Sequence, residues 1–268
     1  MAVAPQNLSA GRLLTRRRVA ACLAEAGVQA GDTVCVHTAL SRLGYVCGGA
    51  RAVIEALYDA VGASGTVMMP SYTRDIADPR EWQYPPAPHA WLDTLVDETP
   101  AYDPKLSPSQ NVGAVAELFR TYPGVLRSGH PISSVAAIGP NAERLTANVP
   151  LDGRFGPDSP YGRLVRLGGK AVMLGAPYET MSLLHLSQYL VGWSEPVVKS
   201  ACMMVNGERR WVQFNDVLFP HEWASRCVAT MIEQRVARRK PCGNADIVTV
   251  NAKDALDFAL NWRRQNNC

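Results

Sequence analysis

The segment of residues 168–185 combines the residue types best suited to chemistry. The short apolar run 171–174, bounded by glycines, predicts a buried strand, and the pattern of residues 182–190 predicts a helix. A loop of small residues lies between them, and in α/β proteins such a loop is the usual place for a functional site. His185, on the predicted helix, would therefore place an imidazole base beside exposed backbone N–H groups.

A second candidate loop follows an earlier predicted strand. His37, Thr38 and Ser41 provide an imidazole and two hydroxyl groups there, and Gly48 and Gly49 precede a predicted helix. N–H groups at such a helix start could bind a phosphate or a thioester oxygen. The glycines match neither the dinucleotide-binding fingerprint nor the phosphate-binding loop, so nucleotide binding of those two kinds loses support.

A third polar cluster holds Arg127, Ser128, His130 and Ser134. Arg127 could pair with a phosphate group, and either serine could bond to a carbonyl group of a ligand. For His130, as for His37, a structural hydrogen bond is as good an interpretation as a catalytic role.

Residues 71–110 break the periodic pattern of the chain, because they are rich in proline and aromatic residues. A connection this long inside a compact domain is usually a lid or a binding loop. Its acids are Asp75, Asp78, Glu81, Asp93, Asp97, Glu98 and Asp103, against the bases Arg74, Arg80 and Lys105. An ordinary solvated loop is one interpretation, but aromatic residues mixed with acids favour recognition of a bulky cation.

The composition is typical of a soluble globular protein. The chain has 268 residues, of which 47% are hydrophobic and 19% charged, and a formal net charge of +3. This charge is too small to indicate a nucleic-acid partner, and no apolar run approaches the roughly 18 residues of a membrane span. The seven cysteines are scattered and indicate neither a disulfide framework nor a zinc site. We expect a cytoplasmic protein with no nucleic-acid partner, no membrane partner and no metal.

Segments with helical and with strand-like hydrophobic periods alternate along the chain, which predicts a single α/β domain over residues 1–268. We expect a mixed sheet with helices on both faces, a lid over 71–110 and a β-hairpin region towards the C-terminus, where strands 197–204 and 210–214 flank Asn206-Gly207. The hairpin is taken as the reason for a mixed sheet. The predicted helices are 15–26, 50–61, 112–122, 182–190, 222–239 and 252–264, and the other predicted strands are 33–37, 66–69, 135–138, 170–174 and 247–250.

Several short motifs in this order resemble the aminoglycoside 3-N-acetyltransferase family, which is distinct from the larger general acetyltransferase superfamily. Each motif alone is weak evidence for the family, but the ordered set is specific and covers most of the chain. The matching stretches are Val36-His37-Thr38-Ala39-Leu40-Ser41-Arg42-Leu43-Gly44, residues 48–57, Gly65-Thr66-Val67-Met68-Met69-Pro70, Tyr102-Asp103-Pro104, Arg127-Ser128-Gly129-His130-Pro131, residues 136–140, Ser159-Pro160 and residues 174–185.

The resemblance implies transfer of an acetyl group from acetyl-coenzyme A to an amine. It assigns the general base to His185, with direct transfer in a ternary complex and no metal. Glu179 could orient the imidazole, or could instead cap the following helix.

The resemblance also implies the binding residues. The loop of His37, Thr38, Ala39, Leu40 and Ser41 would hold the pantetheine arm and present N–H groups to the thioester oxygen. Arg127, Ser128 and Ala176 would also contact the donor. A cationic aminoglycoside would be bound by Tyr72, Asp75, Asp103, Glu117 and Asp216, and the protein could form a homodimer.

The chain departs from the family at one position. Many members have a glutamate three residues after the histidine, where this chain has Gln188. That carboxylate could hold a cationic sugar or tune the base, and an amide keeps the hydrogen bonds but loses the charge. Two alternatives therefore stay open: an N-acetyltransferase for another amine, and a non-catalytic coenzyme A binding protein.

Overall fold

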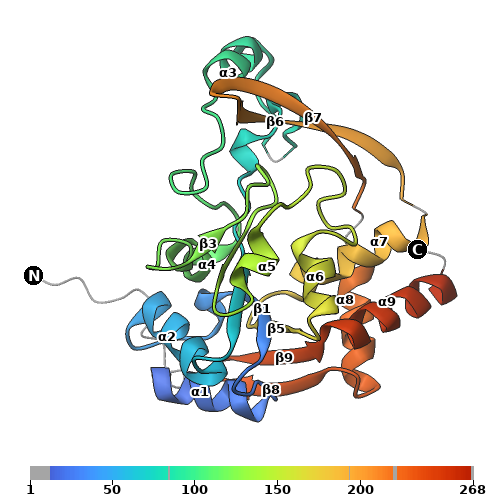
Figure 1. The fold of residues 1–268 in the computed structure, drawn as a ribbon. Helices are drawn as coiled ribbons and strands as arrows, with labels where there is room; N and C mark the ends of the chain where they lie inside the picture. The colour runs from blue at the N-terminus through green and yellow to red at the C-terminus, as the bar shows by residue number, and fades with distance from the viewer. Residues whose placement is uncertain (1–12, 84, 193, 220–221, 267–268) are drawn as a thin grey trace, which may run out of the picture.

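A seven-stranded sheet forms the centre of the protein, with β1 as its middle strand (Figure 1). The computed structural model describes residues 13–83, 85–192, 194–219 and 222–266. From edge to edge the strands are β3 (Leu126–Arg127), β4 (Val135–Ile138), β2 (Thr66–Pro70), β1 (Thr33–Thr38), β5 (Lys170–Leu174), β9 (Ala245–Asn251) and β8 (Arg238–Cys242).

The sheet is mixed because antiparallel strands flank a parallel centre. β2, β1 and β5 are parallel neighbours, whereas β4 and β9 pair with this centre in the antiparallel direction. The edge strands β3 and β8 pair antiparallel with β4 and β9. The three parallel strands therefore bring their carboxyl ends to one edge of the sheet.

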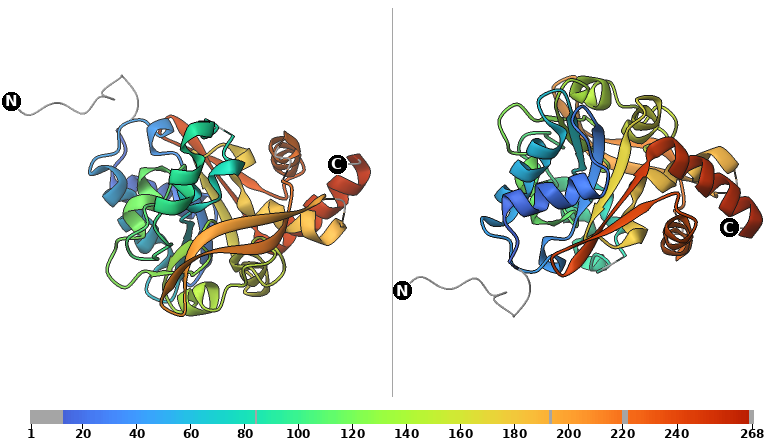
Figure 2. Two further views of the ribbon diagram at one scale, coloured as in Figure 1. Left: turned by 90° about the horizontal axis from the view of Figure 1, so that it is seen from above. Right: turned by 90° about the horizontal axis from the view of Figure 1, so that it is seen from below.

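Helices cover both faces of the sheet, as predicted (Figure 2). Side chains of β1 alternate between two cores, since Val34 and Val36 join one and Cys35 joins the other. The first core includes α1 (Arg16–Glu25), α2 (Gly49–Val61) and α4 (Gly113–Phe119); the second includes α5 (Ala142–Thr146), α6 (Pro160–Arg166), α8 (Glu222–Glu233) and α9 (Ala252–Asn266). Burial on both faces explains why these strands read as continuous apolar runs.

The predicted hairpin forms, but not as part of the main sheet. β6 (Pro196–Val205) and β7 (Glu208–Val217) make a separate two-stranded sheet that arches away towards α3 (Figure 1). Asn206 and Gly207 have positive φ angles of 52° and 83°, as a tight hairpin turn requires. The expectation that this hairpin makes the sheet mixed was therefore wrong.

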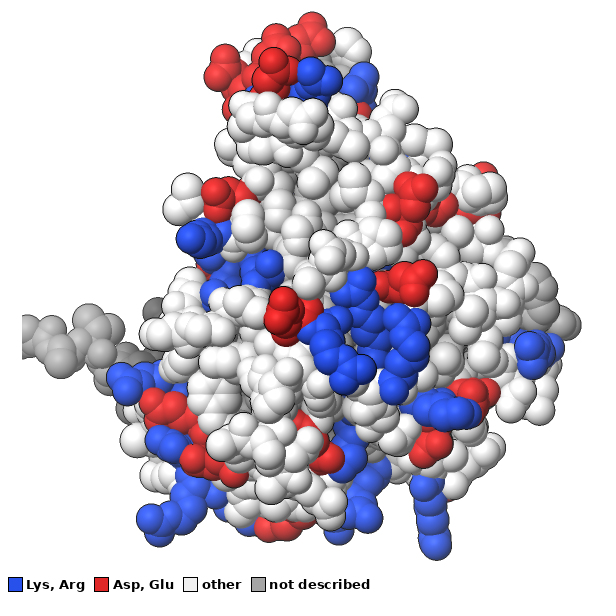
Figure 3. Space-filling view, viewed as in Figure 1, with Lys and Arg blue, Asp and Glu red and all other residues white. Residues whose placement is uncertain are grey.

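Residues 71–110 are tied to this hairpin. The segment contains α3 (Leu92–Glu98) and the short 3-10 helices η2 (Arg74–Ile76), η3 (Pro79–Glu81) and η4 (His89–Trp91). Single β-bridges join Ala77 to Ala201 and Tyr102 to Met203. We call these two segments, residues 71–110 and 196–217, the outer lobe. Acidic side chains gather over α3 at its end, while basic side chains gather near α5 and α6 (Figure 3).

The helix predicted over residues 222–239 is too long. α8 ends at Glu233, Arg235 has a positive φ of 61°, and residues from Arg238 onwards form β8. The amide N–H groups of Val236 and Ala237 both bond to the carbonyl of Met231, which closes the helix without glycine or proline. Arg238, Arg239 and Lys240 therefore lie on an edge strand and not on a helix. Arg16 of α1 forms ion pairs with Glu55 and Asp59 of α2.

No described helix has the length and apolar character needed to cross a membrane. Among the described residues, no group of three or more His, Cys, Asp or Glu side chains is arranged to hold a metal ion. The six cysteines in the described part of the chain are all unbridged, and Cys47 is the exposed one among them.

Candidate active site

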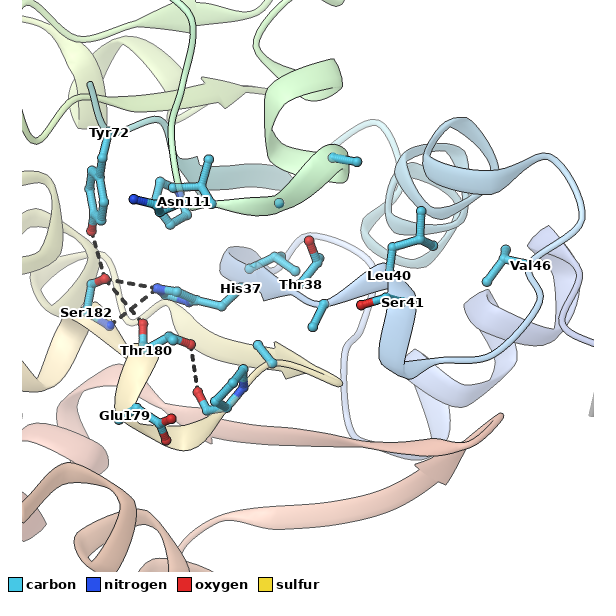
Figure 4. A pocket seen from close by; sticks show the side chains of 18 of the residues that line it. His37, Thr38, Leu40, Ser41, Val46, Tyr72, Asn111, Glu179, Thr180 and Ser182 are labelled. Atoms are coloured by element: carbon cyan, nitrogen blue, oxygen red, sulfur yellow. Dashed lines mark hydrogen bonds between the residues drawn. The ribbon is translucent and has the colours of Figure 1, made fainter. Parts of the chain in front are cut away.

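A cavity of about 880 Å³ opens at the carboxyl ends of β1, β2 and β5 (Figure 4). The loops that follow these three parallel strands meet there, together with the start of α2 and residues 111–114 at the start of α4. Its lining residues are Val36, His37, Thr38, Ala39, Leu40, Ser41, Gly44, Tyr45, Val46, Gly49, Pro70, Tyr72, Arg74, Asn111, Val112, Gly113, Ala114, Ala176, Pro177, Glu179, Thr180, Ser182 and His185. Apolar walls with a few convergent polar groups are typical of a ligand site.

The loop from His37 to Ser41 lines this cavity, and so does Ala176. The amide of Ala39 donates to the carbonyl of Leu174 at 3.0 Å, so this N–H serves the sheet and is not available to a thioester. Leu40 and Ser41 begin η1 (Leu40–Arg42), and the first N–H groups of a helix have no acceptor within it. They are the better candidates for an oxyanion contact.

The start of α2 closes the same end of the cavity. Gly48 precedes the helix in the left-handed region with φ 84°, and Gly49 lines the cavity with φ 57°. A Cβ atom on Gly48 would lie 3.1 Å from Cβ of Ala52, so a side chain there would be both strained and crowded. This thirteen-residue helix directs the positive end of its dipole towards the cavity, which favours an acceptor oxygen.

A hydrogen-bonded network forms the deep wall of the cavity (Figure 4). Tyr72 donates its hydroxyl hydrogen to Oγ of Ser182 at 2.7 Å, and its hydroxyl oxygen lies 2.5 Å from that of the buried Tyr161. Nε2 of His37 lies 3.1 Å from Oγ of Ser182 and accepts from the Ser182 amide at 3.3 Å. Because Nε2 accepts, the proton of the neutral imidazole is on Nδ1.

Burial lowers the pKa of His37 to about 4, so this imidazole is neutral at pH 7. Its ring is part of the wall, and Nδ1 has no hydrogen-bond partner among the described residues. His37 thus anchors the turn that leads to His185, because it accepts from the main chain of η6 (Ser182–Leu184).

His185 lies on the cavity wall at the first position of α7 (His185–Val191). Its Nδ1 is 2.7 Å from Oε1 of Gln188, one helical turn further on. The centroids of the Phe155 and Phe219 rings are 4.8 and 4.7 Å from that of the imidazole. The half-buried ring is therefore held by a hydrogen bond in its plane and by two tilted aromatic rings that pack against it.

Glu179 also lines the cavity but has a different contact. Its Oε2 accepts from the hydroxyl of Ser225 at 2.7 Å, and this hydrogen bond lowers the pKa of the carboxyl group. Glu179 lies in η5 (Tyr178–Thr180) before the base. The imidazole that Glu179 was expected to orient contacts Gln188 through Nδ1.

The residues predicted to bind the acceptor are scattered. Tyr72 lines the cavity, and Asp75 follows the lining residue Arg74, with burial raising the pKa of its carboxyl group. Asp216 is buried beside this region: its Oδ2 lies 2.6 Å from Nε of Arg154, and its Oδ1 accepts from the hydroxyl of Tyr189.

The structure does not bring Asp103 or Glu117 to the cavity. Oδ1 of Asp103 accepts from the amides of Lys105 and Leu106, and these hydrogen bonds lower the pKa of the carboxyl group. Glu117 accepts from the Ser109 amide at 2.7 Å and pairs with Arg120. Both carboxylates are used within local turns, so neither lines the described cavity.

Arg127 and Ser128 are also away from the cavity. The Arg127 guanidinium donates to the carbonyls of Ser71 and Ser107 at 2.6 and 2.5 Å. Oγ of Ser128 accepts from the amide of Val135 at 3.0 Å, within the buried start of β4. Their polar atoms satisfy the main chain where β3, β4 and the segment after β2 meet, which explains why neither lines the site.

Ser182, Arg74 and Asn111 line the cavity but were missed as site residues from sequence. For Ser182 a signal existed, because residues three apart in a helical turn lie on one side and it precedes His185 by three. Arg74 lies in the aperiodic segment 71–110, and Asn111 directly follows it. Residue spacing there does not predict which way a side chain points.

The geometry of the site is typical of one class of enzyme. An oriented imidazole faces a largely apolar cavity at the parallel strand ends of an α/β sheet, as suits an acyltransferase with a general base. A family model described as aminoglycoside 3-N-acetyltransferase matches residues 35–264. The chain belongs to this family and is an acyltransferase.

Known proteins are similar over nearly the whole chain. Aminoglycoside N(3)-acetyltransferase IX of Micromonospora chalcea is 38% identical over 269 residues, covering 94% of both chains. The crystal structure of YokD from Bacillus subtilis has a TM-score of 0.92 at 32% identity, covering 96% of this chain and 95% of that one. AAC-IIIb in a binary complex with CoASH has a TM-score of 0.83 at 30% identity, covering 95% and 98%. The family resemblance and the α/β fold are confirmed.

Proposed function

We propose that this protein transfers the acetyl group of acetyl-coenzyme A directly to an amine of an aminoglycoside, with His185 as the general base. The observation that carries the proposal is the imidazole of His185 on the cavity wall, with Nδ1 held by Gln188. Acetylation at the 3-amino group follows from the family alone. The related AAC-IIIb structure with CoASH supports the choice of donor.

The bond to Gln188 gives the imidazole its chemistry. Oε1 of an amide can only accept, so Nδ1 of His185 donates and Nε2 of the neutral ring is the basic nitrogen. An amine that is protonated in solution must lose a proton before it can attack a thioester. Nε2 takes that proton, and a well-placed base of this kind accelerates the reaction by about 10²- to 10⁴-fold.

The acetyl group then passes directly from donor to acceptor, without a covalent intermediate on the enzyme. The amine nitrogen forms a bond to the thioester carbon, and the carbonyl oxygen becomes an oxyanion that the amides of Leu40 and Ser41 can stabilise. Collapse breaks the carbon–sulfur bond: the nitrogen gives up its second proton to water, and the thiolate takes the proton held by His185. The products are the acetylated amine and free coenzyme A.

The donor fits the side of the cavity formed by β1 and α2. The pantetheine arm is a narrow chain with amide groups, and it would lie along residues 37–41 and Ala176 against Val46 and the start of α2. The acceptor would then approach from Tyr72, Arg74 and the outer lobe. The acidic side chains over α3 would attract a polycationic sugar towards this end, and residues 71–110 would serve as its lid.

A thiol-release assay over a panel of aminoglycosides tests the proposal. We expect acetyl-coenzyme A plus an aminoglycoside to yield free thiol, and His185→Ala to lower kcat by about 10²-fold or more. The exposed His89→Ala variant is the matched control. NMR of the product identifies the acetylated amine. Undiminished thiol release by His185→Ala would refute the assigned base.

Two other functions predict different outcomes in the same assay. An N-acetyltransferase for another amine would release thiol with members of a broad amine panel but not with aminoglycosides. A non-catalytic coenzyme A binding protein would bind the donor and release no thiol with any amine. The cavity favours neither over the proposal, and the family favours the aminoglycoside.

A further inference from the structure

Asn111 has an unusual backbone conformation on the wall of the cavity. Its φ angle is 58°, in the left-handed region that glycine adopts readily and other residues adopt at a cost. Its side chain is exposed and lines the cavity (Figure 4). Among the described residues, none forms a hydrogen bond with the amide group of this side chain. The amide is therefore free to bind a ligand.

The neighbours of Asn111 hold its main chain in place. The amide of Gln110 donates to the carbonyl of Tyr72 at 2.7 Å, and the Gln110 side chain accepts from the main chain of η2 at 3.1 Å. Gly113 lies so close to β1 that a Cβ atom on it would be 3.2 Å from the carbonyl oxygen of Thr38. A backbone held from both sides can keep a strained residue, and such residues are often found at functional sites.

These contacts place Asn111 on the acceptor side of the cavity. Gln110, directly before it, bonds to Tyr72, which is assigned to the acceptor, whereas Gly113 is the residue that reaches the loop of residues 37–41 at Thr38. Asn111 therefore lies nearer to the acceptor than to the pantetheine arm.

The other polar side chains on this side are less suited to a sugar. Among the described residues of 71–113, the polar ones that line the cavity are Tyr72, Arg74 and Asn111. The hydroxyl of Tyr72 already donates to Ser182, and the positive charge of Arg74 would repel a polycation. Asn111 thus provides a neutral group with both an unused donor and an unused acceptor.

We propose that the Asn111 amide binds the aminoglycoside and helps to determine which acceptors the enzyme uses. This inference rests on the proposed function. Oδ1 can accept from an ammonium group, and the amide as a whole can donate to or accept from a sugar hydroxyl. Aminoglycosides differ in how these groups are arranged. A sugar that presents one of them to Asn111 gains a hydrogen bond that another sugar lacks.

Asn111→Gly tests the side chain without disturbing the backbone. Glycine adopts a φ of 58° without a Cβ penalty, so the Tm of the variant should not fall. Loss of the amide should raise the KM for the aminoglycoside about five- to tenfold. Both kcat and the KM for acetyl-coenzyme A should stay within about twofold, since the lost contact is one of acceptor binding.

Asn148→Gly is the matched control. Asn148 has a similar φ of 49° but is not among the residues that line the cavity, so both KM values should stay within about twofold of the wild type. A rise in the KM for acetyl-coenzyme A alone in Asn111→Gly would place the amide on the donor side and overturn the inference.

Asn111→Asp makes use of the opposite charges of the two substrates. Aspartate keeps the shape, tolerates the left-handed conformation and adds a negative charge. The KM for the polycationic aminoglycoside should fall about threefold at low salt, and this gain should shrink as the ionic strength rises. A higher KM for the anionic acetyl-coenzyme A, with no change for the aminoglycoside, would contradict the assigned side.

Calorimetric titration with sisomicin, without acetyl-coenzyme A, separates this inference from the proposed function. Sisomicin is the aminoglycoside bound in the solved structure of AAC-VIa. Its Kd should rise about five- to tenfold in Asn111→Gly, whether or not thiol is released. Absence of thiol release by a wild type that binds sisomicin would count against the proposed function alone. Equal Kd values for the wild type and Asn111→Gly would overturn the role of Asn111.

Discussion

His130 should make the protein sensitive to mild acid. The ring is fully buried, its Nδ1 accepts from the amides of Ile132 and Ser133, and its Nε2 donates to the carbonyl of Leu151. A proton on Nδ1 would break both amide contacts. Burial, with help from the nearby Arg154 charge, lowers the pKa of His130 to about 3.

The sign and size of the effect follow from this pKa. The folded protein binds fewer protons than the unfolded chain, whose histidine pKa is about 6.5, so stability is lost as the pH falls below that value. Between pH 7 and pH 5 the loss from His130 is about 1.5 pKa units, or about 2 kcal/mol. Protonation of His37, with a pKa of about 4, also lowers the stability of the protein as the pH falls.

Urea unfolding at pH 7 and pH 5 measures this loss through tryptophan fluorescence. His130→Asn keeps an oxygen acceptor for the two amides and does not titrate. Its loss of unfolding free energy between the two pH values should be smaller than that of the wild type by about 2 kcal/mol. The exposed His89→Asn should behave like the wild type. An equal pH-dependent loss in His130→Asn and the wild type would refute the reasoning.

Three further predictions concern other parts of the structure. Arg127→Ala should lower the unfolding free energy by about 3 kcal/mol, because buried carbonyls lose their donor, yet leave the KM for acetyl-coenzyme A within about twofold; a tenfold rise would show a donor contact after all. Gly162→Ala places a Cβ 1.9 Å from the carbonyl oxygen of Pro157, so urea unfolding should show about 3 kcal/mol of destabilisation; a stable variant would contradict this packing. Tyr72→Phe removes the hydroxyl contact with Ser182 and should lower kcat about fivefold; an unchanged kcat in the thiol assay would separate this network from catalysis.

The central strands could be predicted because both faces of the sheet are buried. β1, β2 and β5 read as apolar runs bounded by turn residues, and they lie where the sequence placed them. The short helices α5 and α6 were missed, since five and seven residues are too few to show a helical period. The position of the hairpin outside the main sheet could not be predicted either, because the pairing of strands far apart in the sequence depends on tertiary contacts.

The candidate site was predicted where the strand ends determine it. His37 to Ser41, Ala176 and His185 all line the cavity, because parallel strands deliver their following loops to one edge. The same reasoning fails for Arg127 and Asp103, whose polar atoms bond the main chain instead. Residue type alone does not reveal whether an arginine or an aspartate faces a ligand or a neighbouring carbonyl or amide.

The bridges that join the outer lobe connect chain segments about a hundred residues apart, through Tyr102 and Met203 and through Ala77 and Ala201. Neither segment belongs to the sheet that supports the base and the donor half of the cavity. During evolution the outer lobe of such an enzyme can therefore change while the main sheet is conserved, provided that both segments of the lobe change together. Chimeras that exchange a single segment would break these bridges, whereas those that exchange the pair would keep them.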